Sequence, residues 1–187
     1  MSLFTRRSIL ATFPALAVPG AVMAKPKTNP KAGHAPPRPL DEASLPAGTR
    51  TTLARIRSAA RGGDVEALRI TVQRNELPPL FARGTRADPI AILKARSADG
   101  GGRELLHLLL RVLDAGCTGL SSGAAPTQFL WPYYANTPYR RRSPAERAAS
   151  WGLVRVADIG VSIQAGEPQI HRVVIGADGT WQVFAAL

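Results

Sequence analysis

The chain has 187 residues, enough for one domain with a substantial hydrophobic core, and it carries a formal net charge of +11. Its solitary cysteine, Cys117, excludes a scaffold of intramolecular disulfides and is expected to be a small buried side chain. None of the three histidines, His34, His107 and His171, is followed by a metal-ligating residue two, three or four positions later. We therefore expect neither a metal site nor a cofactor.

The N-terminal segment has the pattern of an export signal. Residues 5–10, Thr-Arg-Arg-Ser-Ile-Leu, precede an apolar stretch that runs to Ala24, and this arrangement resembles a twin-arginine signal peptide. We expect cleavage after Ala24 and a mature protein in a bacterial periplasm. The alternative is a membrane anchor, but residues 8–24 fall short of the roughly 20 apolar residues that a spanning helix needs. Pro14 and Pro19 also interrupt them.

Residues 25–46 are rich in lysine, proline and small residues and lack apolar periodicity, which predicts a flexible tether. A single domain is then expected over residues 47–187, without a transmembrane segment. Loss of the signal removes two arginines and no acidic residue, so the formal charge falls from +11 to +9. This charge favours anionic envelope partners, such as lipid head groups, lipopolysaccharide or acidic glycans, over nucleic acid. One alternative is that the partner is another envelope protein, and a second is that the basic surface is only solvated and binds no partner.

The first part of this domain is predicted to be helical, with about four helices. Apolar residues share one face over residues 49–61, and a second helix runs from the cap Asp64 to Asn75. Asp88 and Pro89 suit the start of a third helix. Residues 103–115 are apolar around most of the helical circumference, which predicts a central buried helix with one polar stripe.

The second part is predicted to hold a short helix and a small antiparallel sheet or hairpin. Residues 143–146, Ser-Pro-Ala-Glu, match a capping box that opens a helix ending by Gly152. Residues 156–165 are compatible with either strand or helix. Two apolar stretches, 170–175 and 181–185, flank an Asp-Gly turn and predict a hairpin. The expected fold class is therefore α+β, with helices first and the sheet last.

The remaining segments are predicted to be irregular. Residues 116–126 are small and are expected to form a loop. Residues 129–134 are aromatic and contain Pro132, which we expect to hold them at a sheet edge because proline donates no ladder hydrogen bond. Within them, Trp131 is expected to be buried, and one of Tyr133 and Tyr134 is expected to point outward to water or an arginine.

The main candidate binding region combines aromatic rings with guanidinium groups. Flat rings can stack on sugars or head groups, and arginine forks suit phosphate and carboxylate. Packing of the rings in the core and solvation of the arginine run are the alternatives. The residues are Trp131, Tyr133, Tyr134, Arg140, Arg141 and Arg142.

A second candidate is a cleft along the polar stripe of the 103–115 helix, formed by Glu104, His107 and Arg111. Residues 119–123 also match the Gly-x-Ser-x-Gly pattern of a hydrolase nucleophile, with Ser121 as nucleophile and His107 or His171 as base. The flanking residues do not predict the strand and helix that such a nucleophile needs. We therefore expect a non-catalytic module that binds an envelope component or partner, and the alternative is a small hydrolase of an envelope ester or glycan.

Four stretches of the sequence carry a resemblance to a family. They are Asp88-Pro89-Ile90, residues 102–106, residues 129–135 and residues 176–181. Together they look like an uncharacterised family of exported proteobacterial proteins. The resemblance implies an exported domain, brings no established activity, and does not include the arginines at 140–142.

Overall fold

A computed structural model of the protein describes residues 37–82, 88–121 and 123–186. Their sheet is antiparallel, with strand order β1-β2-β3-β4. The strands are β1 (Thr118–Leu120), β2 (Gln128–Trp131), β3 (His171–Gly176) and β4 (Trp181–Ala186). The expected signal peptide and most of the expected tether lie outside the described residues.

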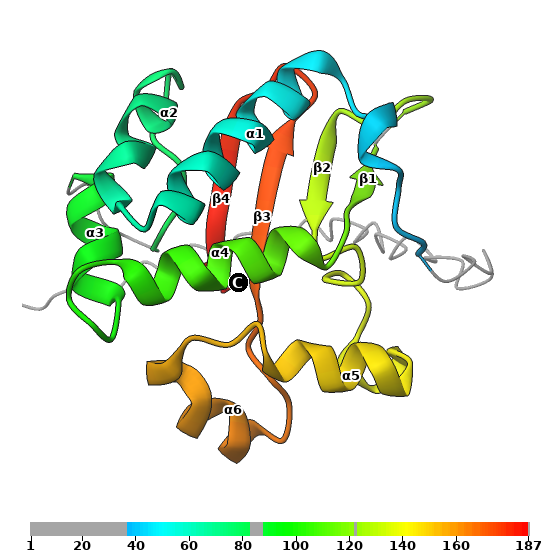
Figure 1. The fold of residues 1–187 in the computed structure, drawn as a ribbon. Coiled ribbons are helices and arrows are strands. Elements are labelled where there is room, and N and C mark those ends of the chain that lie inside the picture. The colour runs from blue at the N-terminus through cyan, green and yellow to red at the C-terminus, as the bar shows by residue number, and fades with distance from the viewer. Residues whose placement is uncertain (1–36, 83–87, 122, 187) are drawn as a thin grey trace, which may run out of the picture. The chain divides into compact units, whose positions relative to one another are not determined.

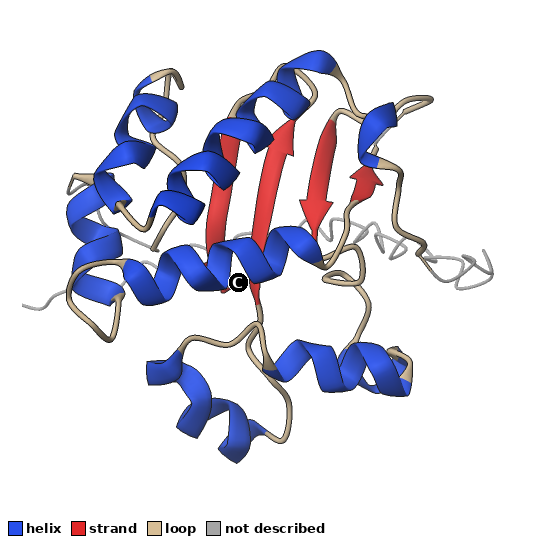
Figure 2. Ribbon diagram, in the orientation of Figure 1, coloured by secondary structure: helices blue, strands red, loops and turns tan. Residues whose placement is uncertain are grey.

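Six α-helices accompany the sheet in this part of the chain. They are α1 (Ala47–Gly62), α2 (Arg69–Gln73), α3 (Pro89–Arg96), α4 (Arg103–Asp114), α5 (Pro144–Trp151) and α6 (Ile159–Ala165). Helices α1 and α4 cover the same face of the sheet, and α5 and α6 lie beyond α4 near the start of β3 (Figures 1 and 2). The predicted α+β class, with a closing hairpin of β3 and β4, is confirmed. Residues 156–165, left open between strand and helix, form a 3₁₀ turn followed by α6.

The predicted helix boundaries follow from local caps. Asp88 accepts a hydrogen bond from the Ala91 amide at the start of α3, and Ser143 and Glu146 form the expected capping box at the start of α5. Each cap pairs a backbone amide that the helix itself cannot satisfy. These local signals are therefore sufficient to begin the two helices at the positions predicted from the sequence.

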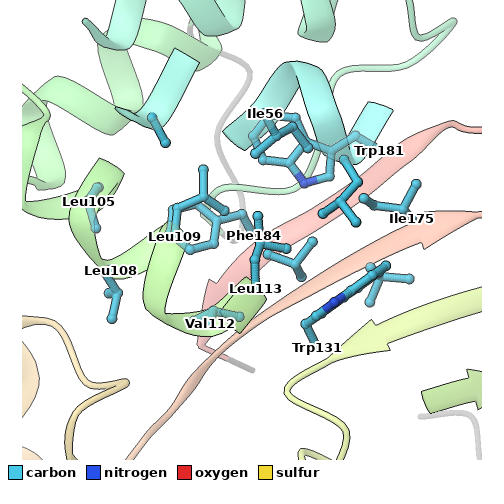
Figure 3. Packing of buried hydrophobic residues seen from close by; sticks show 14 of the residues in the cluster. Ile56, Leu105, Leu108, Leu109, Val112, Leu113, Trp131, Ile175, Trp181 and Phe184 are labelled. Carbon is cyan, nitrogen blue, oxygen red and sulfur yellow. The ribbon is translucent and has the colours of Figure 1, made fainter. Parts of the chain in front are cut away.

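The core lies between α4 and the sheet. Leu109, Val112 and Leu113 of α4 are completely buried, as are Trp131 of β2 and Trp181 of β4. Figure 3 shows these side chains gathered in one cluster that also includes residues of α1. Burial of each large apolar side chain is worth about 1.5 to 3 kcal/mol. The prediction that residues 103–115 form the central helix is confirmed.

Two features of the sheet differ from the sequence prediction. Residues 118–120 form β1 inside the segment predicted to be a loop, and β2 is an internal strand between β1 and β3 rather than an edge strand. The ladder of β2 ends at Trp131. Pro132 therefore lies just past the last strand residue, where its lack of an amide donor costs no ladder hydrogen bond.

The segment expected to be a tether packs on the domain from Leu40 onward. The Leu40 amide donates to the Cys117 carbonyl at 2.8 Å, and Leu45 is buried in the core. The compact domain thus begins before residue 47, because an apolar side chain and a backbone hydrogen bond fix this segment. At the other edge of the sheet, Leu80 exchanges backbone hydrogen bonds with Gln182 and Phe184 of β4. That contact covers an edge strand that would otherwise expose its polar backbone.

Helix α1 is joined closely to the turn between β3 and β4. The hydroxyl of Thr49 donates to the Gly176 carbonyl at 2.9 Å, and that of Thr52 donates to the Gly179 carbonyl at 2.6 Å. Gly48 makes the approach possible, because a Cβ atom there would lie 2.5 Å from the Asp178 carbonyl oxygen.

We predict that Gly48→Ala lowers the free energy of unfolding by about 1 to 3 kcal/mol, because the new methyl group would push α1 away from the turn. Gly62→Ala is the control, since a Cβ at Gly62 would meet nothing within 4 Å. The control should be neutral or stabilising by up to about 1 kcal/mol. Urea unfolding of the two variants and the wild type measures both effects, and equal stabilities for the two variants would contradict the close contact.

Candidate functional site

A surface groove of about 630 Å³ lies between two segments that are far apart in the sequence. One wall comes from residues 135–142, which follow β2, and the other from residues 165–172, which lead from α6 into β3. Its polar lining residues include Asn136, Thr137, Tyr139, Arg142, Gln169 and Arg172. The volume is in the range of sites for small organic ligands.

Arg142 is the most buried charged residue of the groove, with 7% of its surface exposed. Its Nε donates to the Thr137 carbonyl at 3.0 Å and its Nη1 donates to the Ser150 hydroxyl at 2.8 Å. These bonds hold the loop after β2 against α5. Burial lowers the pKa of Arg142 below its ordinary value, yet a guanidinium remains charged at neutral pH.

Arg172 brings a second guanidinium to the same groove from β3. Its Nη1 donates to the Asn136 side-chain oxygen at 3.4 Å, across the groove from β3 to the opposite wall. Burial lowers the pKa of Arg172, and the positive charge of Arg142 lowers it further. The two cations thus disfavour one another, and an anion between them would relieve this cost.

The aromatic residues predicted to bind are mostly packing residues. Trp131 is completely buried and Tyr134 is 2% exposed. Tyr133 is half-buried, but its hydroxyl donates to Glu146 at 2.6 Å instead of reaching water or an arginine as we expected. Burial and this carboxylate raise the pKa of Tyr133 to about 12. None of the three rings lines the groove, whereas Tyr139 does.

The three predicted arginines separate into two kinds. Arg142 lines the groove, while Arg140 and Arg141 are exposed in the adjoining 3₁₀ turn Tyr139–Arg141 and do not line it. The Trp151 indole N–H donates to the Tyr139 hydroxyl at 3.1 Å, so this half-exposed tryptophan is connected to a groove residue.

The alternative cleft on α4 is not brought together as a site. The two carboxylate oxygens of Glu104 accept backbone hydrogen bonds from Ala98 at 2.6 Å and Val156 at 2.7 Å, so Glu104 joins two loops. His107 and Arg111 are exposed on the helix surface and line no part of the groove.

The serine pattern lies in a strand–loop–strand context. Residues 118–120 form β1, which pairs with β2, and the described residues between Ser121 and β2 are not helical, whereas a nucleophile elbow requires a helix after the serine. The Ser121 hydroxyl donates to the Gly123 carbonyl within its own loop. His171, proposed as its base, is 2% exposed at the start of β3.

Sequence reasoning missed Arg172, Asn136 and Gln169. A signal for Arg172 was present, since it is the one charged residue in the apolar stretch 170–175. Its placement in the groove depends on the pairing of β2 with β3, which local patterns do not specify.

Among the residues that the structure describes, no group of three or more His, Cys, Asp or Glu side chains could hold a metal ion. No helix in those same ranges combines the length and apolar character needed to cross a membrane. Comparisons with protein-family models, curated proteins and solved structures find no match to this chain.

His171 provides a pH-dependent test of this structure. Burial lowers its pKa from 6.5 to about 4, although the nearby Asp158 acts in the opposite direction. Between these values the unfolded chain binds a proton that the folded chain does not, so stability falls as the pH drops from 6.5 toward 4. The full shift corresponds to about 3 kcal/mol.

We predict that His171→Gln makes the free energy of unfolding less dependent on pH over this window, measured by urea unfolding at several pH values. His107→Gln is the matched control because His107 is exposed. If both variants kept the wild-type pH dependence, His171 would not be buried in its neutral form.

Proposed function

We propose that the protein is an exported, non-catalytic binding module whose groove holds a carboxylate or phosphate group of an envelope component. The observation that carries this proposal is the presence of two partly buried guanidinium groups, Arg142 and Arg172, in one groove. The twin-arginine pattern at residues 5–10 supports export. The formal charge of +9 that remains after loss of the signal supports an anionic partner.

The geometry around Arg142 suits a binding role because the side chain is already fixed. Its hydrogen bonds to Thr137 and Ser150, and a cation–π contact at 5.8 Å from the Tyr139 ring centroid, hold the guanidinium in place without a carboxylate ion pair among the described residues. A preorganised donor loses little conformational entropy when a ligand binds. Charge-assisted bonds from such a fork are also stronger than neutral ones.

The other lining residues favour an anion that is carried on a polar body. Asn136 and Gln169 offer amides, and Thr137 and Tyr139 offer hydroxyls, all of which can bond to sugar or glycerol oxygens. Glu167 also lines the groove, and its negative charge disfavours a ligand that carries more than one anionic group. A sugar or head group that carries a single anionic group, a carboxylate or a phosphate, fits this chemistry.

The test is a titration of the folded protein with inorganic phosphate and with glucuronate, followed by tryptophan fluorescence and by amide chemical shifts. We predict that shifts concentrate in residues 135–142 and 165–172 and that Arg172→Gln weakens binding by about tenfold or more, because charge-assisted bonds contribute about 1.5 to 3 kcal/mol. Arg141→Gln is the control, since Arg141 is exposed outside the groove.

A second variant guards against an indirect effect of losing Arg172. Asn136→Asp keeps the size of the side chain and puts a negative charge opposite Arg172, so it should also abolish anion binding. Circular dichroism confirms that each variant is folded. Absence of wild-type binding to both probes, or equal losses in Arg141→Gln and Arg172→Gln, would refute the groove as an anion site.

A further inference from the structure

A small polar pocket of about 280 Å³ lies where α1, the end of α2 and the turn between β3 and β4 meet (Figure 1). Residues within the ranges 48–55, 71–75 and 178–180 line it, and we call it the turn pocket. The Thr52 hydroxyl, which donates to the Gly179 carbonyl, ties α1 to the turn. The Asn75 side chain donates to the Trp181 carbonyl at 2.6 Å and ties the end of α2 to β4. The pocket is therefore held open by fixed elements, and it shares no lining residue with the groove.

Three charged side chains line the turn pocket without pairing with one another. Arg55 comes from α1, Arg74 follows α2, and Asp178 lies in the turn. None of the three forms an ion pair with a residue that the structure describes. Hydrogen bonds from the Thr180 amide and hydroxyl lower the pKa of the Asp178 carboxyl, which is therefore ionised at neutral pH. The pocket thus presents two positive charges and one negative charge to a ligand.

The turn pocket also contains a buried hydroxyl group without a hydrogen bond. Thr71 of α2 is 4% exposed, and its hydroxyl bonds to no residue in the described ranges. Its neighbours in the pocket differ, because the hydroxyls of Thr51 and Thr52 both donate to backbone carbonyls. The Thr71 oxygen is not fully enclosed, so a ligand in the pocket can reach it. A ligand oxygen at this position would pair a polar group that the fold leaves unpaired.

We propose that the turn pocket binds a free acidic amino acid, such as glutamate or aspartate. The two carboxylates of this ligand would pair with Arg55 and Arg74, its ammonium group would pair with Asp178, and the Thr71 hydroxyl would donate to a carboxylate oxygen. The ligand then matches the unpaired charges of the pocket in number and in sign. Inorganic phosphate would instead be repelled by Asp178. The volume lies below that of sites for drug-sized ligands, which suits a molecule of this size.

The experiment titrates the folded protein with L-glutamate and follows the heat of binding and the amide chemical shifts. We expect the shifts to concentrate in residues 48–55, 71–75 and 178–180. Arg74→Gln should weaken binding by about tenfold or more, because it removes charge-assisted hydrogen bonds. Arg61→Gln is the matched control, since Arg61 is an exposed arginine of α1 that does not line the turn pocket.

A change of ligand distinguishes this charge pattern from a general attraction to anions. Glutarate carries the two carboxylates of glutamate but no ammonium group, so the wild-type protein should bind glutarate more weakly. Asp178→Asn keeps the size of the side chain and removes its negative charge. This variant should bind glutarate at least as tightly as glutamate, and circular dichroism confirms that it is folded.

Thr71→Val tests the unpaired hydroxyl, because it replaces the hydroxyl by a methyl group of similar size. Glutamate binding should weaken by about threefold to tenfold, without a loss of stability in urea, since the hydroxyl has no partner in the described part of the free protein. Arg172→Gln should retain wild-type affinity for glutamate, so failure of the groove proposal would leave this one intact. Absence of wild-type binding, shifts confined to the groove residues 135–142 and 165–172, or equal wild-type affinity for glutamate and glutarate would overturn the inference.

Discussion

The packing of α4 against the sheet is the constraint on which the rest of the domain depends. The buried leucines of α4 meet Trp131 and Trp181 in one cluster, and this contact fixes the positions of β2 and β3 side by side. The chain leaves β2 after Trp131 and enters β3 at His171. One groove wall follows the end of β2 and the other leads into the start of β3. The distance between the walls is therefore set by the positions of these two strands in the core and not by the loops themselves.

Arg142 holds the loop that follows β2 in place by hydrogen bonds to that loop and to α5. A buried guanidinium is unfavourable without hydrogen-bond acceptors. Here the carbonyls of Thr137 and Ala135 and the Ser150 hydroxyl each accept one bond, which leaves two of its five N–H groups for a ligand. The hydrogen bonds that the buried guanidinium needs therefore hold Ala135 and Thr137, two residues that line the groove, in place. The same charge remains available to attract an anion, so a structural role and a binding role are compatible in one side chain.

The sequence was sufficient for the elements that local chemistry specifies. The caps at Asp88 and Ser143, the apolar periodicity of α4 and the Asp178-Gly179 turn each act within a few residues. Strands β1 and β2 are short, and their pairing brings together residues that local patterns do not relate. The groove was not predictable for the same reason. Arg172 and Asn136 are 36 residues apart in sequence, and the tyrosines that suggested a binding surface pack instead against the core and Glu146.

The ambiguity of residues 156–165 has a physical explanation in the structure. Ile159, Val161 and Ile163 alternate with smaller or polar residues, which is the period-two pattern of a half-buried strand. A helix places such residues over a wide arc, so they cannot all face one core. The segment is nevertheless helical. Its buried residue is Ser162, whose hydroxyl accepts a hydrogen bond from the Gln169 amide, and the apolar residues are left exposed. The apolar pattern therefore could not decide between strand and helix, because the buried residue of α6 is a small polar side chain that this pattern does not mark.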